Sequence, residues 1–393
     1  EDAIAIGLGR RPKYLTFRGE NLETPRSRLI RLKTPILIDV IPVNGVVNGP
    51  IDSNEELWLP LFEAAQSVGT HITMRLGEII NYGPKIVDRI DSLILRLTAE
   101  EMKNFLAGEK WPDVLKGRLP GMVEMEVDDE LLHRLDEIPR IFPESTVLSA
   151  VVQIEKGYVD SDLRPTKVFQ RILEPLILSP FDILCITSDY NPEKGYYLTT
   201  DGVPAVHRFL VEKKLRHRFS IVGAGGIRSA ADAQKTVQRG ANGVKIDWPI
   251  LLVEDPHARQ KFLKREKTEI LHETSVLGKR IANLIRVWNV QVTEVLGASG
   301  FKDIKKTVGE ENRLVIFDDL EERVYDILHN PFRQERNEKA NRERIDREGL
   351  MVGYGWRYSQ LKEMIQPTLL PHRFYDAKLP PPCYRIFDQD HVW

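Results

Sequence analysis

Gly223-Ala-Gly-Gly-Ile-Arg-Ser-Ala-Ala-Asp232, followed by Gly240-Ala-Asn-Gly-Val-Lys-Ile-Asp-Trp-Pro249, is the stretch that indicates the fold. It predicts a buried strand over 219–222, a glycine-rich turn, a helix capped by Ser229 and a second buried strand over 243–246. The turn leaves backbone N–H groups uncovered beside the positive end of a helix, which suits a dianionic phosphate without a lysine. In a (β/α)8 barrel such groups bind after strands seven and eight. The alternative is a βαβ unit whose glycines serve steric needs alone.

Apolar runs alternate with helical patterns through the preceding part of the chain, which predicts parallel βαβ units. We expect seven or eight strands between residues 34 and 250, which favours a closed (β/α)8 barrel over the competing open doubly wound sheet. The remaining expected strands are 34–43, 70–76, 93–97, 146–154 and 182–188. The expected helices are 55–68, one opened by the capping-box pattern Thr98 to Glu101, 131–138, 166–178 and 203–214. Residues 81–120 are otherwise ambiguous.

The chain divides into three expected parts. Residues 1–33, rich in Arg and Pro, form an irregular N-terminal arm that wraps on the domain, and residues 34–310 form the barrel with a long helix over 272–290. Residues 311–393 form a C-terminal extension with a short helix at 322–328, a charged solvated linker at 333–348 and an aromatic, proline-rich end from Gly349. We expect that end to pack on its own barrel, a second protomer or a partner protein.

Composition excludes several classes of protein. The chain has 393 residues, a net charge of −2 and 42% hydrophobic residues, which is typical of a globular protein without an overall field for nucleic acid. Two cysteines, Cys185 and Cys383, exclude a disulfide framework, and Cys185 lies in an apolar run that predicts a buried thiol. No run reaches about 18 apolar residues, so we expect no membrane span, and without a signal-peptide pattern we expect a cytoplasmic protein. The basic run 213–218 lacks interleaved aromatics, which argues against nucleic-acid binding.

Four pieces of the sequence, in order, resemble the FMN-binding barrel of glutamate synthases. The first is Thr34-Pro-Ile-Leu-Ile-Asp39 with the Gly45/Gly49 loop and Val68-Gly-Thr70, and the second is Gly77-Glu78 at the family's Gly-Glu-Gly motif. The third is Gly117-Arg-Leu-Pro-Gly121, and the fourth is Glu294-Val-Leu-Gly-Ala-Ser-Gly-Phe-Lys-Asp303 after the barrel. The resemblance covers roughly residues 25 to 310 and implies a flavin-binding barrel.

The sequence also departs from that family. The cysteines of the family's iron–sulfur cluster are missing from 248–256, and no glutaminase module is present, so the resemblance implies FMN without a cluster. The family's Asp-Gly-Gly-Thr-Gly-Ala loop corresponds here to Ser188-Asp-Tyr-Asn-Pro-Glu-Lys-Gly195, in which only Asp189 matches. The strand that brings a lysine to the flavin is here Ser149-Ala-Val-Val-Gln-Ile154, without a lysine.

The expected cofactor site lies at the ends of the last two strands. We expect Gly223, Gly225, Gly226 and Ile227 to receive the phosphate, with the backbone of Ile246 and Asp247 beside them, because a carboxylate turned to a dianion is unfavourable. A flavin ring also needs a basic or donor group, and Arg75, Arg96 and Gln153 lie near predicted strand ends. Each of these three has an equally simple structural interpretation.

Glu78 and Asp189 are the expected catalytic carboxylates. By resemblance Glu78 faces substrate, where it would move a proton or hold an imine nitrogen, and the alternative is a glutamate that starts a helix. Asp39, at the end of an apolar run, is a further candidate because a buried carboxylate needs partners. His71 and His207 lack catalytic companions, the nine histidines form no metal-ligand pattern, and we expect no metal site.

These features predict an FMN-dependent oxidoreductase that reduces an imine or similar bond of a 2-oxo acid or amino acid. Electrons and any ammonia would come from a partner subunit, NAD(P)H or free solution, and we expect a homo-oligomer or a complex. The second hypothesis is a barrel that has lost its redox role and serves as a structural or regulatory subunit. The third is a barrel enzyme without flavin that grips a phosphorylated substrate.

Overall fold

The computed structural model describes most of the first 310 residues and two short pieces near the C-terminus. The described residues are 2–10, 16–18, 21–23, 28–39, 55–82, 88–115, 117–155, 157–160, 163–188, 190–191, 195–196, 199–254, 274–310, 351–352 and 356–357. Residues 1–310 form one compact unit and residues 311–393 a second. Within the second unit only a two-stranded sheet of β15 (Met351–Val352) and β16 (Trp356–Arg357) is described, so the predicted helix at 322–328 and linker at 333–348 lie outside the described residues.

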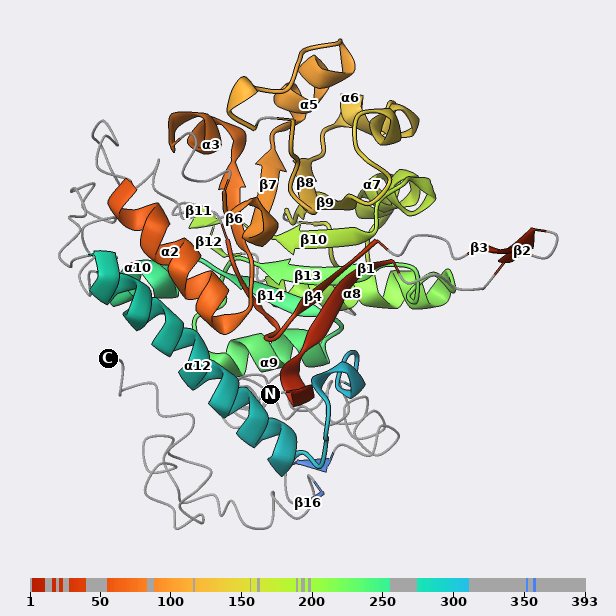
Figure 1. Ribbon diagram of the computed structural model, residues 1–393. Coiled ribbons are helices and arrows are strands. Elements are labelled where there is room, and N and C mark those ends of the chain that lie inside the picture. The colour runs from red at the N-terminus through yellow and green to blue at the C-terminus, as the bar shows by residue number, and fades with distance from the viewer. Residues whose placement is uncertain are drawn as a thin grey trace. The chain divides into compact units, whose positions relative to one another are not determined.

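Eight parallel strands close into a barrel, which confirms the predicted (β/α)8 fold and excludes the open sheet (Figure 1). In order around the barrel they are β5 (Ile36–Ile38), β6 (Ile72–Arg75), β7 (Leu93–Leu97), β8 (Met122–Glu126), β9 (Val147–Gln153), β10 (Ile183–Thr187), β13 (Ser220–Ala224) and β14 (Gly243–Ile246). Ile38 pairs with Ile72 and Val244 pairs with Ile36, so the first strand joins both the second and the last. The glycine-rich turn therefore follows strand seven, as predicted.

The barrel strands are buried over most of their length. β7, β13 and β14 are buried at every residue, as expected of parallel strands between a packed interior and an outer layer of helices. Strand β8 was not predicted, since Met122-Val-Glu-Met-Glu126 places two glutamates among its apolar residues. The first strand is described only over Ile36–Ile38, and 40–54, the second half of that predicted strand and the loop after it, lie outside the described residues.

Helices follow the strands and form the outer layer (Figure 1). They are α2 (Glu55–Val68), α3 (Leu76–Tyr82), α5 (Ala99–Leu106), α6 (Asp129–Leu132), α7 (Lys167–Leu178), α8 (Thr199–Glu212), α9 (Ala230–Gln238) and α10 (Trp248–Glu254). The predicted capping box is present, because Thr98 Oγ1 accepts from the Glu101 backbone and Glu101 Oε2 accepts from Thr98. The predicted helix over 131–138 is instead α6 followed by a 3₁₀ segment, Leu135–Arg140.

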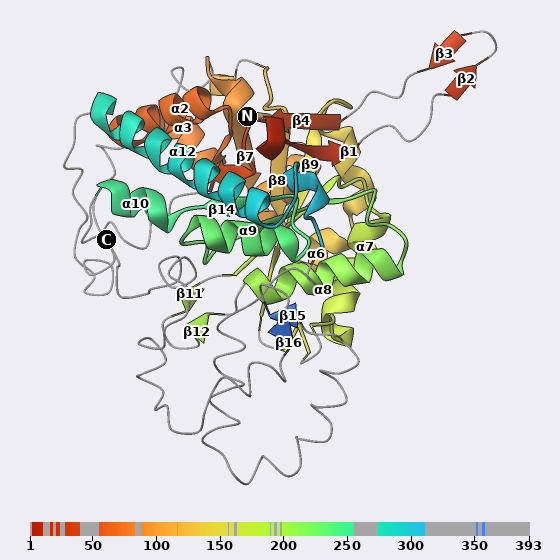
Figure 2. The same ribbon diagram turned by 90° about the horizontal axis from the view of Figure 1, so that it is seen from below.

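The long helix α12 (Thr274–Ala298) lies beside α2 in both views (Figures 1 and 2). One stripe of its side chains is buried, and it consists of Leu277, Ile281, Ile285, Trp288, Val292 and Leu296. This spacing follows the helical repeat and anchors α12 on the barrel. None of the helices in the described residues is both long and apolar enough to cross a membrane.

The N-terminal arm is not irregular, which corrects the prediction. β1 (Ile6–Arg10) pairs antiparallel with β4 (Arg28–Leu32), and the pair contacts β9 and β13. The contacts are made at the amino ends of the barrel strands, because Ser220, the first residue of β13, accepts a hydrogen bond from the Gly9 backbone at 3.1 Å. The arm therefore covers the amino mouth of the barrel, opposite the carboxyl mouth where barrel enzymes carry their sites.

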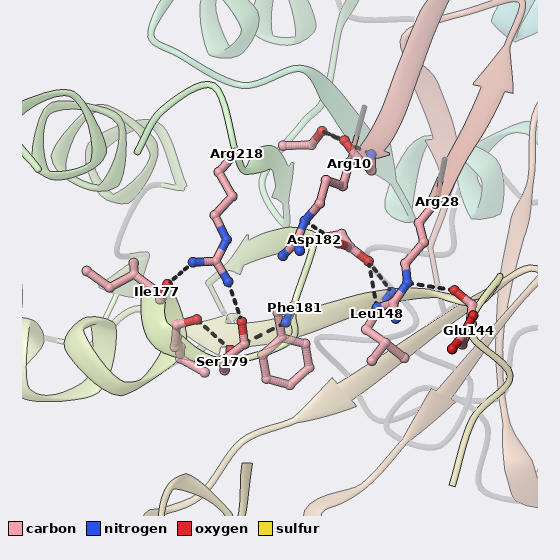
Figure 3. Close-up of polar contacts among 12 residues, drawn as sticks. Arg10, Arg28, Glu144, Leu148, Ile177, Ser179, Phe181, Asp182 and Arg218 are labelled. Atoms are coloured by element: carbon pink, nitrogen blue, oxygen red, sulfur yellow. Dashed lines mark hydrogen bonds and ion pairs between the residues drawn. The ribbon is translucent and has the colours of Figure 1, made fainter. Parts of the chain in front are cut away.

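Asp182, which precedes β10, holds this cover in place (Figure 3). Its fully buried carboxylate lies 3.2 Å from Arg10 Nε and 3.8 Å from Arg28 Nη1, and it accepts from the Leu148 backbone at 3.3 Å. Burial raises the pKa of Asp182 more than these partners lower it. Arg218 lies nearby but bonds to the carbonyls of Ile177 and Ser179. The basic run 213–218 thus serves internal contacts in part.

Removing the arginine partners of Asp182 is expected to destabilise the barrel. The double substitution Arg10→Met/Arg28→Met removes both ion-pair partners of the buried Asp182 carboxylate and leaves only the more distant Arg218, which bonds to backbone carbonyls. We expect the free energy of unfolding to fall by about 2–4 kcal/mol, the cost typical of stranding a buried charge. Urea unfolding measures it, with the exposed Arg31→Met in the same strand as the control. Equal midpoints for both variants would contradict this role of Asp182.

Candidate functional site

Two glycines with left-handed backbone shape the turn after β13. Gly225 has φ +80° and Gly226 has φ +75°, angles that a side chain disfavours. A Cβ on Gly225 would lie 2.5 Å from the carbonyl oxygen of Ser188, at the end of neighbouring strand β10, whereas a Cβ on Gly226 would meet no atom within 4 Å. Gly225 is thus required by packing. Gly226 borders open space, and neither its backbone N–H nor that of Ile227 donates a hydrogen bond within the described residues.

Helix α9 starts directly after this turn, and Ser229 is its N-cap as predicted. Ser229 Oγ accepts from the Asp232 backbone at 3.2 Å. The carboxylate of Asp232 returns to the turn, where it accepts from the Arg228 backbone at 3.1 Å and from Ser229 Oγ at 3.0 Å. Arg228 is mostly exposed, with its Nε 4.0 Å from that carboxylate. One negative charge therefore already occupies the helix start, and Arg228 offsets it, a pair that sequence reasoning missed.

The end of β14 lies beside this turn. Gly223 and Val244 are register partners on β13 and β14, so the strand ends that carry Gly225 and Asp247 are adjacent. Ile246 is fully buried, and the Asp247 carbonyl accepts from the Ile250 backbone at 3.0 Å as α10 begins. The structure thus brings all six predicted phosphate-site residues together at the carboxyl ends of strands seven and eight.

A second feature is a group of buried charged and polar side chains in the barrel interior, which we call the interior ion network: Asp39, Thr73, Arg96, Glu124 and Lys245. Lys245 Nζ lies 2.6 Å from Glu124 Oε2, 2.7 Å from Thr73 Oγ1 and 3.6 Å from Asp39 Oδ1. Arg96 binds the same Glu124 oxygen through Nε at 3.2 Å and Nη2 at 3.0 Å, and its Nη2 lies 3.0 Å from Asp39 Oδ1. Two cations and two carboxylates from strands one, three, four and eight are therefore paired.

The side chains at the inner end of the network are shielded from solvent, and those at the carboxyl mouth are slightly exposed. The side chains of Glu124 and Lys245 are 0% exposed, while those of Arg96 and Asp39 are 9% and 8% exposed. Burial opposes the charge of Arg96, but Asp39 and Glu124 outweigh it and raise the pKa of Arg96. Within the described part of the chain, Glu124 Oε1 and the Oγ of its register neighbour Ser149 have no hydrogen-bond partner. Cys185 is buried beside the network, as predicted, and burial raises its pKa to about 12.

Arg75 and Glu78 form the rim at strand two. Glu78 lies in the first turn of α3, and its Oε2 accepts from the Arg75 backbone at 2.8 Å, so the interpretation as a helix-starting glutamate is supported. Arg75 is the register partner of Arg96, and its buried Nε has no hydrogen-bond partner among the residues that the structure describes. Both arginines lie close enough to Glu78 to lower its pKa, but desolvation is larger and raises it. Within the described residues, the rim therefore combines a guanidinium nitrogen without a hydrogen-bond partner and a carboxyl group whose pKa is raised by burial.

The raised pKa of Glu78 predicts a pH-dependent stability. A folded-state pKa above the unfolded value of 4.5 means that the protonated form stabilises the fold, and this contribution is lost as pH rises through the folded-state pKa. We expect the stability of the wild type relative to Glu78→Gln to fall as pH rises above about 4.5 and then to level off. Urea unfolding of both proteins from about pH 4 to about pH 8 measures it. Parallel curves would show that Glu78 titrates as it does in the unfolded chain.

The other candidates have mixed outcomes. Gln153 ends β9 with an exposed side chain, and Asp189 lies outside the described residues. Burial lowers the pKa of His71, whose Nδ1 has no partner. His207 accepts from Arg216 Nε at 3.0 Å through Nδ1, which fits a structural histidine. Among the described residues no group of three or more His, Cys, Asp or Glu could hold a metal ion.

Sequence reasoning missed Glu124 and Lys245. Lys245 lies between Val244 and Ile246 in a strand that was predicted correctly, and a lysine inside such a run was a usable signal. A charged side chain there must turn into the barrel and find a partner. Glu124 was missed with its strand.

The chain is similar to part of several known enzymes. It is 30% identical over 123 residues to the archaeal glutamate synthase [NADPH] of Methanocaldococcus jannaschii, and 35% identical over 125 residues to the archaeal-type glutamate synthase [NADPH] of Thermotoga maritima. Each match covers 29% of this chain and 24% of the relative, so the chain corresponds to about a quarter of those enzymes. No family model matches the chain. Among solved structures, mandelate oxidase with a monooxide FMN adduct aligns with a TM-score of 0.46 and 11% identity, over 78% of this chain and 86% of that chain.

Proposed function

We propose that this chain is an FMN-dependent oxidoreductase related to the flavin-binding part of glutamate synthases. The observation that carries the proposal is the open turn at Gly226 and Ile227 after strand seven, with the end of strand eight beside it. The backbone N–H groups of these two residues donate no hydrogen bond to any described residue. This is where barrels bind phosphate groups. The partial similarity to archaeal glutamate synthases supports FMN as the ligand that carries the phosphate.

The residues present fit the phosphate end of FMN. The N–H groups of Gly226 and Ile227 would donate to it, the start of α9 would add partial positive charge, and the exposed Arg228 would add a full one. Asp232 opposes an anion, but its carboxylate is held by the Arg228 backbone and the Ser229 hydroxyl. Asp247 would contribute its backbone rather than its side chain.

FMN, when bound, would supply hydride chemistry, and this chain's residues would supply charge and protons around it. The unpaired Nε of Arg75 and the mouth-facing end of Arg96 would hold polar or anionic groups at the rim. Glu78, whose pKa is raised, would give a proton to the reduced product. Asp189 remains a second catalytic candidate. Gln153, at the carboxyl end of β9, remains a candidate hydrogen-bond donor to the flavin.

The finer proposal concerns substrate and electron supply. We infer that the reaction reduces an imine or similar C=N or C=C bond of a 2-oxo acid or amino acid in the cytoplasm. Electrons and any ammonia would reach the site from a partner subunit, from NAD(P)H or from solution. A homo-oligomer or multisubunit complex is the expected assembly.

The deciding experiment is an absorption spectrum of freshly purified protein from about 300 to about 550 nm, with the released cofactor identified by mass. A flavin envelope and released FMN support the proposal. A colourless protein that also refuses added FMN overturns it. Phosphate competition would then separate an enzyme of phosphorylated substrates from a subunit without a ligand.

Two observations favour the second candidate, a barrel kept as a structural or regulatory subunit. Strand β9 has no lysine, and the carboxylate of Asp232 already occupies the helix start. That candidate predicts co-purification with a partner and no bound flavin. The open glycine turn argues for the enzyme. A turn that binds no phosphate would not need a glycine with a left-handed backbone at position 226, where a side chain would meet no neighbouring atom.

A further inference from the structure

The interior ion network is costly for a barrel to keep. Barrel interiors are usually filled with branched apolar side chains, and replacing a buried ion pair by apolar residues is often neutral or stabilising. Here four charged groups occupy that position, and Glu124 and Lys245 have no exposed surface at all. Stability alone therefore does not explain the network.

The network has a direction. Its inner end is the contact of Lys245 with Glu124 and Thr73, and its outer end is the contact of Arg96 with Asp39, which follows β5 at the carboxyl mouth. Glu124 Oε2 links the two ends, because it accepts from Lys245 and from two nitrogens of Arg96. The only network side chains with measurable exposure are the two at the mouth.

We propose that Glu124 and Lys245 are positioning residues that fix Arg96 and Asp39 at the carboxyl mouth, so that Arg96 presents a held guanidinium to the bound ligand. The inference rests on the proposed function for the identity of that ligand, FMN or its anionic substrate. Glu124 orients the guanidinium by accepting from both Nε and Nη2, and Lys245 holds the same Glu124 oxygen from the inner side as a second cation. This arrangement gives the site a cation although β9 has no lysine.

A matched pair of double variants tests the inference. Glu124→Met/Lys245→Met removes the inner ion pair and both hydrogen bonds from Arg96 to Glu124, so that Arg96 keeps only its contact with Asp39. Glu124→Gln/Lys245→Met removes the same charges but keeps an oxygen for Arg96. Neither variant touches a mouth residue. Both should fold, because each deletes a cation and a carboxylate together. Arg10→Met, which alters an ion pair at the opposite mouth, is the control.

We expect the Met/Met variant to bind FMN about tenfold or more weakly than the wild type, and the Gln/Met variant within about threefold of it. The loss should be larger for reduced than for oxidised FMN, because reduction adds negative charge that a held cation stabilises. Arg10→Met should leave both affinities unchanged. Equal affinities for the two doubles, or equal losses for oxidised and reduced FMN, would overturn the positioning role.

A readout without ligand separates this inference from the proposed function. Solvent exchange of the Arg96 Nε–H, followed by NMR in the apoprotein, should be slow in the wild type and the Gln/Met variant and fast in the Met/Met variant. If the wild type binds no FMN, the proposed function is wrong, but the exchange measurement still tests whether Glu124 anchors Arg96. Fast exchange in the wild type, or slow exchange in both doubles, overturns the anchoring itself.

Discussion

Gly226→Val is expected to abolish FMN binding while leaving a folded barrel. A Cβ at this position meets no atom within 4 Å, so the side chain is accommodated and the cost is the strain of a β-branched residue at φ +75°. That strain is about 1–3 kcal/mol. The isopropyl group then occupies the space beside the free N–H groups of Gly226 and Ile227, where the phosphate would lie. We expect the affinity for FMN to fall by about 100-fold or more, since several charge-assisted hydrogen bonds are lost together.

Gly225→Val is the matched contrast. The backbone angle is similar, but a Cβ here would lie 2.5 Å from the carbonyl oxygen of Ser188. Because that oxygen belongs to the backbone, relieving the clash would require a shift of the main chain. Strain and overpacking together predict a loss of about 2–6 kcal/mol in the free energy of unfolding of the apoprotein. Thermal or urea unfolding of both apoproteins, followed by flavin titration, separates the two glycines. A Gly226→Val protein that binds FMN like the wild type would place the phosphate elsewhere.

The turn, the cap and the strands around it could be predicted from sequence because local rules act together there. Glycines next to a buried strand, a serine at the helix start and a second apolar run determine a βαβ unit with little help from the rest of the chain. The same holds for the capping box at Thr98. The closed barrel followed from the number of such units.

Sequence reasoning failed where long-range pairing overrides local pattern. β8 was missed because two of its five residues are glutamates, and the charge partners of Glu124, Arg96 and Lys245, come from other parts of the chain. The pairing of β1 with β4 and the ion pair from Arg10 to Asp182 also join segments far apart in sequence. No periodicity within a short window contains that information. Arg96 and Asp39 were each noticed singly, but their pairing required the fold.

Glu124→Met alone is expected to be the most destabilising substitution in the barrel interior. It leaves Lys245, which is 0% exposed, and the inner side of Arg96 facing a thioether that cannot accept their hydrogen bonds. Breaking one partner out of a buried pair costs about 3–5 kcal/mol, because the remaining charge stays desolvated. Asp39 lies 3.6 Å from Lys245 Nζ and compensates only in part.

Adding Lys245→Met to that variant should restore most of the lost stability. The stranded ammonium is then gone, and Arg96 retains Asp39 as its counter-charge at 3.0 Å. We expect a coupling free energy of about 2–3 kcal/mol between the two positions in a double-mutant cycle, measured by urea unfolding of the wild type, both single variants and the double. Additive losses would mean that Lys245 and Glu124 do not act as a pair. A fully recovered double that still binds FMN poorly would show that the network is retained for the ligand at the mouth and not for the fold.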